Sequence, residues 1–411
     1  MLRDQVVMIA FTTFANAVAT AFQFVMARMM TATMWTDTFV LLALLTLLAV
    51  PSGAVNTLAV KMTGELYVRG DVIGMRRWLI RSLLRVGAVA SAVGVFLAIA
   101  SPWLADFLKI ESPASIFAVA IALVVIMVLS VVKGSLAGVS AFTVLGAITV
   151  GETSGRLVFA VVMVLVGFGA AGAVGGSAFG AAIALMVGLL MLRAVAPLAS
   201  SSTPIANSDV PEAPDQSRIM VISLALAAIF NADILVVNNV FSSEDAASYS
   251  AMALIGRSLF FVASPVATVV LPHTIRAMAQ GGKVLPILVM SVGLILGIVL
   301  GAALVLLLFA SQIFDLIFGD EYTLDLVVMT LYVVAGSLLA VTFTMAQLLI
   351  GAGRLRIWVV MIVGALTMVI AMATLGAGLV HIASILVITL SVTCAYLAIE
   401  TLLEVRQERV A

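Results

Sequence analysis

Four ionisable residues stand well inside long apolar stretches of the sequence: Glu152, Arg156, Asp233 and Arg257. A charged side chain deep in an apolar medium is costly unless it is paired or hydrated, and it is usually kept for a function. Each of the four is therefore a candidate for binding a charged ligand or a coupling ion.

Arg257 and Asp233 are predicted at similar depth on consecutive helices. A guanidinium can hold an anionic group such as a diphosphate through paired hydrogen bonds, and it keeps its proton, so Arg257 is a candidate substrate-binding residue. Asp233, with Asn231 and Asn238 nearby, is a candidate coupling site for H⁺ or Na⁺. The alternative is that Arg257 and Asp233 form an ion pair with each other.

Glu152 and Arg156 are four residues apart, so on a helix they share a face and can form an ion pair. In a second interpretation both line a cavity wall, with Arg156 binding substrate and Glu152 the coupling ion. Arg28 closes the first apolar stretch, where its side chain can reach the lipid head groups or face a substrate.

The composition places most of these residues in lipid. The chain has 411 residues, of which 64% are hydrophobic and only 10% are charged, whereas a soluble domain has about 25% charged residues. The net charge of zero gives no reason to expect a nucleic-acid partner. Cys394 is the single cysteine, and His273 and His381 are predicted about a membrane apart. The sequence therefore predicts no metal site, no organic cofactor and no catalytic constellation.

Twelve stretches are long enough to cross a bilayer as helices, which takes about 20 apolar residues each. They fall at about 5–27, 38–60, 78–104, 114–133, 144–167, 172–193, 219–241, 247–271, 285–310, 325–348, 357–375 and 379–401. A polar segment rich in proline and serine separates the first six from the last six. The predicted architecture is an all-α polytopic membrane protein with an N-terminal lobe over 1–193, a cytoplasmic linker over 194–217 and a C-terminal lobe over 218–411.

The lysines and arginines predict the orientation. With a cytoplasmic N-terminus, sixteen of them fall in inside segments, and only Arg28 and Lys109 fall outside. This positive-inside distribution predicts that both termini are cytoplasmic. Four of the inside arginines form a cluster, Arg76, Arg77, Arg81 and Arg85, which fits contacts with anionic membrane lipid or the gathering of diphosphate substrates.

The two halves match in helix spacing when the first is shifted by 210 residues, which lays Phe39 on Tyr249 and Glu111 on Glu321. An even number of helices in each half makes the repeats parallel. Transporters built in this way hold substrate between their halves and rock one against the other. We therefore expect two six-helix lobes around a central cavity.

Several segments resemble a known family. Asn231 and Asp233 form an Asn-x-Asp element, followed by a short loop, Tyr249 and a helix that ends in Leu271-Pro272. Ala27-Arg28 and the segment Phe318-Gly319-Asp320-Glu321-Tyr322 add to the pattern. The sequence resembles the polysaccharide transporter family, the Wzx-like flippases of the multidrug/oligosaccharidyl-lipid/polysaccharide exporter (MOP) superfamily.

The resemblance implies a flippase that moves a polyprenyl-diphosphate-linked oligosaccharide across a bacterial inner membrane for polysaccharide biosynthesis. The implied partners are the lipid-linked oligosaccharide, membrane lipid and glycan polymerase or assembly proteins. The main alternative is a cation-coupled multidrug or metabolite antiporter of the same superfamily. An enzyme acting on lipid-linked glycans would need a sizeable outer domain, and every predicted outer loop is short. A non-transporting scaffold would have no need for deep ionisable residues.

Overall fold

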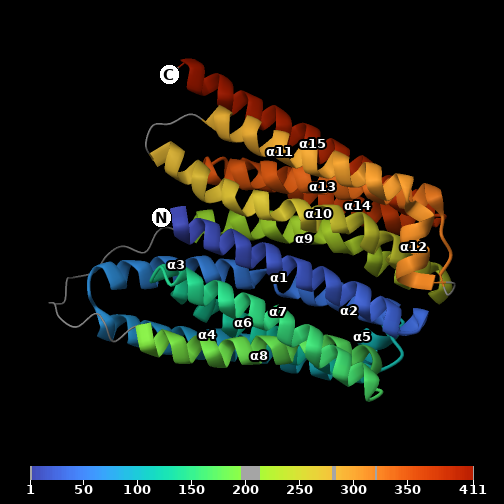
Figure 1. Cartoon of the computed structure of the whole chain (residues 1–411), viewed down its shortest axis with the longest axis horizontal. Coiled ribbons are helices and arrows are strands. Elements are labelled where there is room, and N and C mark those ends of the chain that lie inside the picture. Colours follow the sequence, from blue (N-terminus) through green and yellow to red (C-terminus); the bar gives the residue numbers. More distant parts are fainter. Residues whose placement is uncertain (1, 196–212, 280–283, 320–321, 411) are drawn as a thin grey trace. The chain divides into compact units, whose positions relative to one another are not determined.

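The computed structural model describes residues 2–195, 213–279, 284–319 and 322–410, and all regular elements in these ranges are helices (Figure 1). The first half contains α1 (Leu2–Met29), α2 (Ala32–Leu48), α3 (Pro51–Val68), α4 (Val72–Ile99), α5 (Ser101–Phe107), α6 (Pro113–Gly138), α7 (Phe142–Leu165) and α8 (Gly169–Val195). The second contains α9 (Ala213–Val240), α10 (Ser243–Ala279), α11 (Val284–Leu308), α12 (Ala310–Phe318), α13 (Leu326–Gly351), the short 3₁₀ helix η3 (Leu355–Ile357), α14 (Trp358–Leu375) and α15 (Leu379–Val410).

Eleven helices of the described residues are long and apolar enough to cross a membrane, and the bent pair α2–α3 makes a twelfth span. This confirms the predicted polytopic all-α fold with about twelve transmembrane helices. The α2–α3 pair bends by 43°, and Pro51 opens α3 at the bend. Proline fits there because the first turn of a helix needs no backbone N–H donor.

Several helices run further than their apolar stretches predicted. The second span was expected over 38–60, yet α2 and α3 together cover 32–68 with one break. Lys61 and Glu65, which lie four residues apart in the added part, form an ion pair at 3.7 Å and are about a third exposed. Hydropathy marks where lipid ends, whereas a helix continues as long as its backbone hydrogen bonds and side chains permit.

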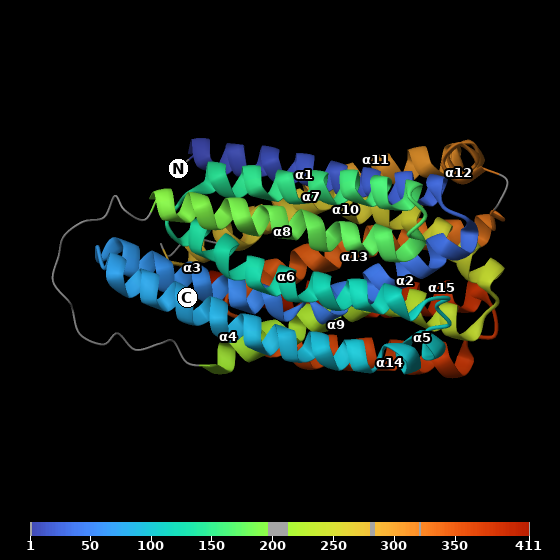
Figure 2. The ribbon, with the colours of Figure 1, turned by 90° about the horizontal axis from the view of Figure 1, so that it is seen from below.

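The chain forms two compact units. One comprises residues 1–30 and 37–216, and the other comprises residues 31–36 and 217–411. Most of the predicted linker, 196–212, lies outside the described residues. Within the first unit, α8 packs against both α6 and α7, as Figure 2 shows.

Small residues set the closest helix crossing in the second unit, between α10 and α13. A Cβ atom added to Gly336 would lie 2.1 Å from the carbonyl oxygen of Gly256, and one added to Gly256 would lie 2.6 Å from the Tyr332 backbone. The two backbones are therefore in contact, which is typical of membrane helices that associate through glycine. The crossing places Arg257 of α10 beside Tyr332 of α13.

Both units contain the same loop clamp. In the first, Asp37, the sixth residue of α2, accepts the backbone N–H of Glu111 at 3.1 Å. In the second, Ser248, the sixth residue of α10, accepts the backbone N–H of Thr323 at 3.1 Å. The two clamps are offset by about 210 residues, the offset at which the sequence predicts an internal repeat.

The glycine crossing gives a stability prediction. Gly336→Ala should lower the free energy of unfolding by about 1–3 kcal/mol, because the new methyl group forces α10 and α13 apart. Gly297→Ala in α11 is the matched control, since nothing lies within 4 Å of its Cβ position and alanine is the better helix former. Thermal unfolding in one detergent measures both variants. Equal melting temperatures for the two would contradict a close crossing.

Candidate functional site

The second unit buries an acidic side chain within a cluster of hydrogen-bond donors. An Nη2 atom of Arg257 lies 2.7 Å from Oδ1 of Asp233. The hydroxyl of Tyr332 donates to the other carboxylate oxygen, Oδ2, and the hydroxyl of Tyr249 lies 3.5 Å from that same oxygen. Asp233 and Tyr249 are 0% exposed, Tyr332 is 1% exposed and Arg257 is 5% exposed. The cluster is thus shielded from bulk water.

Aromatic rings surround the ion pair. The Arg257 guanidinium carbon lies 4.8 Å from the centroid of the Phe230 ring, a cation–π distance. The rings of Tyr249 and Tyr332 meet edge to face at 5.1 Å. A small cavity of about 10 Å³, roughly the space of one water molecule, adjoins Arg257, Phe230 and Tyr332. The site therefore combines one carboxylate, one fixed cation and room for at most a small ion or water.

Helix α9 is held in this unit mainly through side chains. The backbones of α10 and α13 lie close together, as do those of α13 and α15, whereas none of the described helices approaches the α9 backbone as closely. Asp233 reaches across to α10 and α13, and Phe230 packs against Phe260 at 5.2 Å. Asp233 thus links α9 to α10 and α13, beside buried apolar side chains of α9 such as Ile222 and Ile229.

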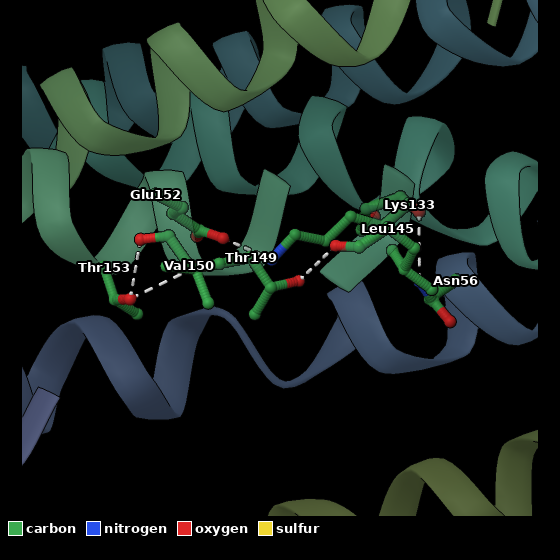
Figure 3. A network of polar contacts seen from close by, with 8 residues as sticks. Asn56, Lys133, Leu145, Thr149, Val150, Glu152 and Thr153 are labelled. Atoms are coloured by element: carbon green, nitrogen blue, oxygen red, sulfur yellow. Dashed lines mark hydrogen bonds and ion pairs between the residues drawn. The ribbon is translucent and has the colours of Figure 1, made fainter. Parts of the chain in front are cut away.

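A second polar cluster lies in the first unit, on α3, α6 and α7. Figure 3 shows Lys133 of α6 reaching Glu152 of α7, with which it forms an ion pair. The Asn56 amide donates to the backbone carbonyl of Ser130 at 3.3 Å. The side chains of Lys133 and Glu152 are 22% and 21% exposed, so this cluster is partly open where the Asp233 cluster is closed.

The predicted ion pair between Glu152 and Arg156 does not form, and that interpretation is wrong. Glu152 pairs with Lys133 instead, and the guanidinium carbon of Arg156 lies 3.9 Å from the centroid of the Phe22 ring on α1. The Nε atom of Arg156 is buried without a hydrogen-bond partner among the described residues. Lys133 was taken as the cytoplasmic end of a span, but α6 continues to Gly138 and carries it into the helix.

Glycines on α8 position this face of α7. A Cβ atom at Gly180 would lie 2.3 Å from the Glu152 carbonyl oxygen, and one at Gly176 would lie 2.6 Å from the Arg156 carbonyl oxygen. The α8 backbone therefore covers the backbone of α7 at these two residues. Their charged side chains extend to α6 and α1 instead, where Lys133 and Phe22 meet them.

The remaining candidates stand apart from both clusters. Arg28 is exposed in the last turn of α1, about 9 Å along the helix axis from Phe22. The Asn231 side chain donates to the carbonyl of Ala227 on its own helix. His381 is exposed at the start of α15. Across the described residues, no group of three or more His, Cys, Asp or Glu side chains has the arrangement of a metal site.

Comparison with known proteins gives a match in structure only. No protein-family model matches the sequence, and no curated protein is significantly similar to it. An inward-facing multidrug resistance MATE family transporter of the MOP superfamily superposes with a TM-score of 0.70 at 12% identity, covering 99% of each chain. The eukaryotic MATE transporter AtDTX14 gives a TM-score of 0.69 at 13% identity, with 99% of this chain and 98% of that chain covered.

The chain has the MATE fold. A MATE in complex with MaD5 gives a similar result, with a TM-score of 0.69 at 14% identity and 99% and 97% of the two chains covered. The MATE neighbours therefore agree with the predicted all-α polytopic fold.

The buried ion pair gives a second stability prediction. Asp233→Asn or Arg257→Gln alone should cost about 3–5 kcal/mol, because each leaves an unpaired charge in a dry site. The double variant should cost much less than the sum of the two, which the double-mutant cycle measures.

The partly exposed Lys133–Glu152 pair provides the comparison. Lys133→Met and Glu152→Gln should show a coupling of about 1 kcal/mol or less, since water screens that pair. Chemical denaturation in detergent is the measurement. Equal couplings for the two pairs would mean that the Asp233 site is hydrated.

Proposed function

We propose that this chain is a cation-coupled antiporter for small organic molecules, working in the manner of a multidrug or metabolite exporter. The support is structural: its neighbours are described as MATE and multidrug resistance MATE transporters, and the similarity extends over 99% of the chain. The deep ionisable side chains agree, since a non-transporting scaffold has no use for them.

The observation that carries the proposal is the environment of Asp233. Its carboxylate holds Arg257 of α10 and Tyr332 of α13, while the α9 backbone packs less closely than those of α10 and α13 among the described helices. Binding of a proton or Na⁺ at this carboxylate cancels the charge that attracts Arg257. The bonds that position α9 then weaken, so ion binding at Asp233 changes the packing of the lobe. Such a link between ion occupancy and helix packing is what antiport requires.

The open cluster of the first unit is the proposed substrate-contacting part. The Lys133–Glu152 pair offers one cation and one carboxylate on partly exposed helix faces. Arg156 adds a second cation, which lies against the buried ring of Phe22. We assign Glu152 a role there as a second coupling candidate, and Arg28 a role at the outer end of α1. The proposed setting is a bacterial inner membrane, with both termini cytoplasmic as the positive-inside distribution predicts.

The test of coupling uses purified protein in liposomes under an imposed pH or Na⁺ gradient, with transport of ethidium followed by fluorescence. Asp233→Asn should reduce gradient-driven transport by about 10-fold or more, because the amide binds neither ion as a carboxylate does. Asp315→Asn on α12 is the matched control, since Asp315 is exposed.

A folding defect is separated from a coupling defect by ethidium binding to the detergent-purified variant. The proposal requires Asp233→Asn to bind the dye while failing to move it against a gradient. Gradient-driven transport at the wild-type rate in this variant would exclude Asp233 as the coupling site.

The second candidate function is the flippase for a polyprenyl-diphosphate-linked oligosaccharide. The observation in its favour is Arg156, whose guanidinium lies on a ring and has no ion pair with an acidic residue in the described part of the chain. Lys133 and Arg156 carry two positive charges and Glu152 carries one negative charge, so the cluster has a net charge of +1. A diphosphate is a suitable ligand for such a site.

Liposomes carrying a labelled lipid-linked oligosaccharide distinguish the two functions. The flippase requires the label to change leaflet, as measured by its protection from an external sugar-modifying enzyme, and requires Arg156→Gln to slow that change by about 10-fold. Gradient-driven ethidium transport with an immobile lipid-linked sugar would support the antiporter and remove the flippase from consideration.

A further inference from the structure

One face of α4 carries a line of arginines that the transport sites do not use. Arg77, Arg81 and Arg85 follow one another at intervals of four residues, so they lie on one side of the helix. All three are exposed. In the part of the chain that the structure describes, none of them lies within 4.0 Å of an acidic side chain, although ion pairs such as Lys61–Glu65 form on the neighbouring α3.

This face points away from the rest of its unit. The buried residues of α4 are Met75, Ala90, Gly94 and Leu97, which fall on the opposite side of the helix. Gly94 packs there against Val124 and Ala120 of α6. The arginines therefore meet whatever surrounds the lobe and not its interior.

The length of α4 is compatible with a third arginine at or just below the membrane surface. Its 28 residues span about 42 Å, whereas the hydrocarbon core is about 30 Å thick. Arg85 is 14 residues from the Ile99 end, a distance of about 21 Å along the axis. With Ile99 at one boundary of the hydrocarbon, Arg85 lies inside the opposite boundary, and its side chain must reach back toward the head groups. A cation there needs an anion close by.

Beyond Arg85 the same face becomes wholly apolar. It continues through Ala88, Ala92, Val95 and Ile99, all exposed. Val95 is 58% exposed and Ile99 is 76% exposed. A single surface strip thus presents three cations and then about 16 Å of hydrocarbon-compatible side chains from Ala88 onward.

We propose that this strip binds one anionic phospholipid of the leaflet at the N-terminal end of α4. The lipid phosphate lies against Arg81 and Arg85, with Arg77 nearer the aqueous side, and an acyl chain runs along the apolar continuation. Paired guanidinium hydrogen bonds suit a phosphate oxygen pair. The change from cationic to apolar along one line matches an amphiphile and not a free anion.

The test counts lipids bound to the full-length detergent-purified protein by native mass spectrometry during titration with phosphatidylglycerol or phosphatidylcholine. The wild-type protein should prefer phosphatidylglycerol, and Arg81→Gln with Arg85→Gln should weaken its binding by about 10-fold. The matched control is Arg193→Gln with Arg356→Gln, which removes two other exposed arginines. Arg81→Lys with Arg85→Lys should retain part of the preference, since charge remains while the paired geometry is lost.

Two results would overturn the proposal. One is equal weakening in the control pair, which would reduce the effect to general attraction between positive protein and negative lipid. The other is displacement of phosphatidylglycerol by millimolar inorganic phosphate, which would make the strip a site for free anions. Melting curves that match the wild type show that the variants, all at exposed positions, are folded.

Discussion

The second unit depends on the need to neutralise a carboxylate that is removed from bulk water. Asp233 is 0% exposed, so protein groups must stabilise its charge. Arg257 and Tyr332 donate the hydrogen bonds that water would otherwise give to the carboxylate, and they come from two different helices. The pairing therefore fixes the relative positions of α9, α10 and α13. The glycine crossing of α10 and α13 is a condition for this, because it brings Arg257 and Tyr332 within reach of one acceptor.

The two charged clusters differ in a way that suits different tasks. The Asp233 cluster is buried and surrounded by rings, and its carboxylate accepts from Arg257 and Tyr332, so bulk water does not screen a change in its charge. The Lys133–Glu152 cluster is partly exposed, and water can compensate there for the loss of either partner. In the proposed exchanger, the buried Asp233 cluster binds the ion and the partly exposed Lys133–Glu152 cluster contacts the substrate. The two clusters lie in separate units.

Composition and hydropathy were enough to predict the twelve spans. In lipid, a single segment can satisfy all its backbone hydrogen bonds internally only as a helix. They also selected Asp233 and Arg257, because charges in apolar stretches are rare. The partners of these charges were harder to predict. Tyr332 carries no charge that would make it stand out, and only a three-dimensional arrangement brings it to Asp233. Lys133 was missed because the hydropathy pattern ended its helix too early. The predicted Glu152–Arg156 pair was wrong because residue spacing on one helix gives no information about a lysine on a neighbouring helix.

The two loop clamps fit the internal repeat that the sequence predicts. Asp37 and Ser248 occupy the same position in their helices and accept the same kind of backbone N–H, yet one is an acid and the other an alcohol. What the two halves share is an oxygen atom at a given place, and many residue types can provide it. In a repeat of this kind, the position of an acceptor atom can stay the same while the residue that supplies it changes. Hydrogen-bond geometry therefore offers a comparison of the two halves that residue identity does not.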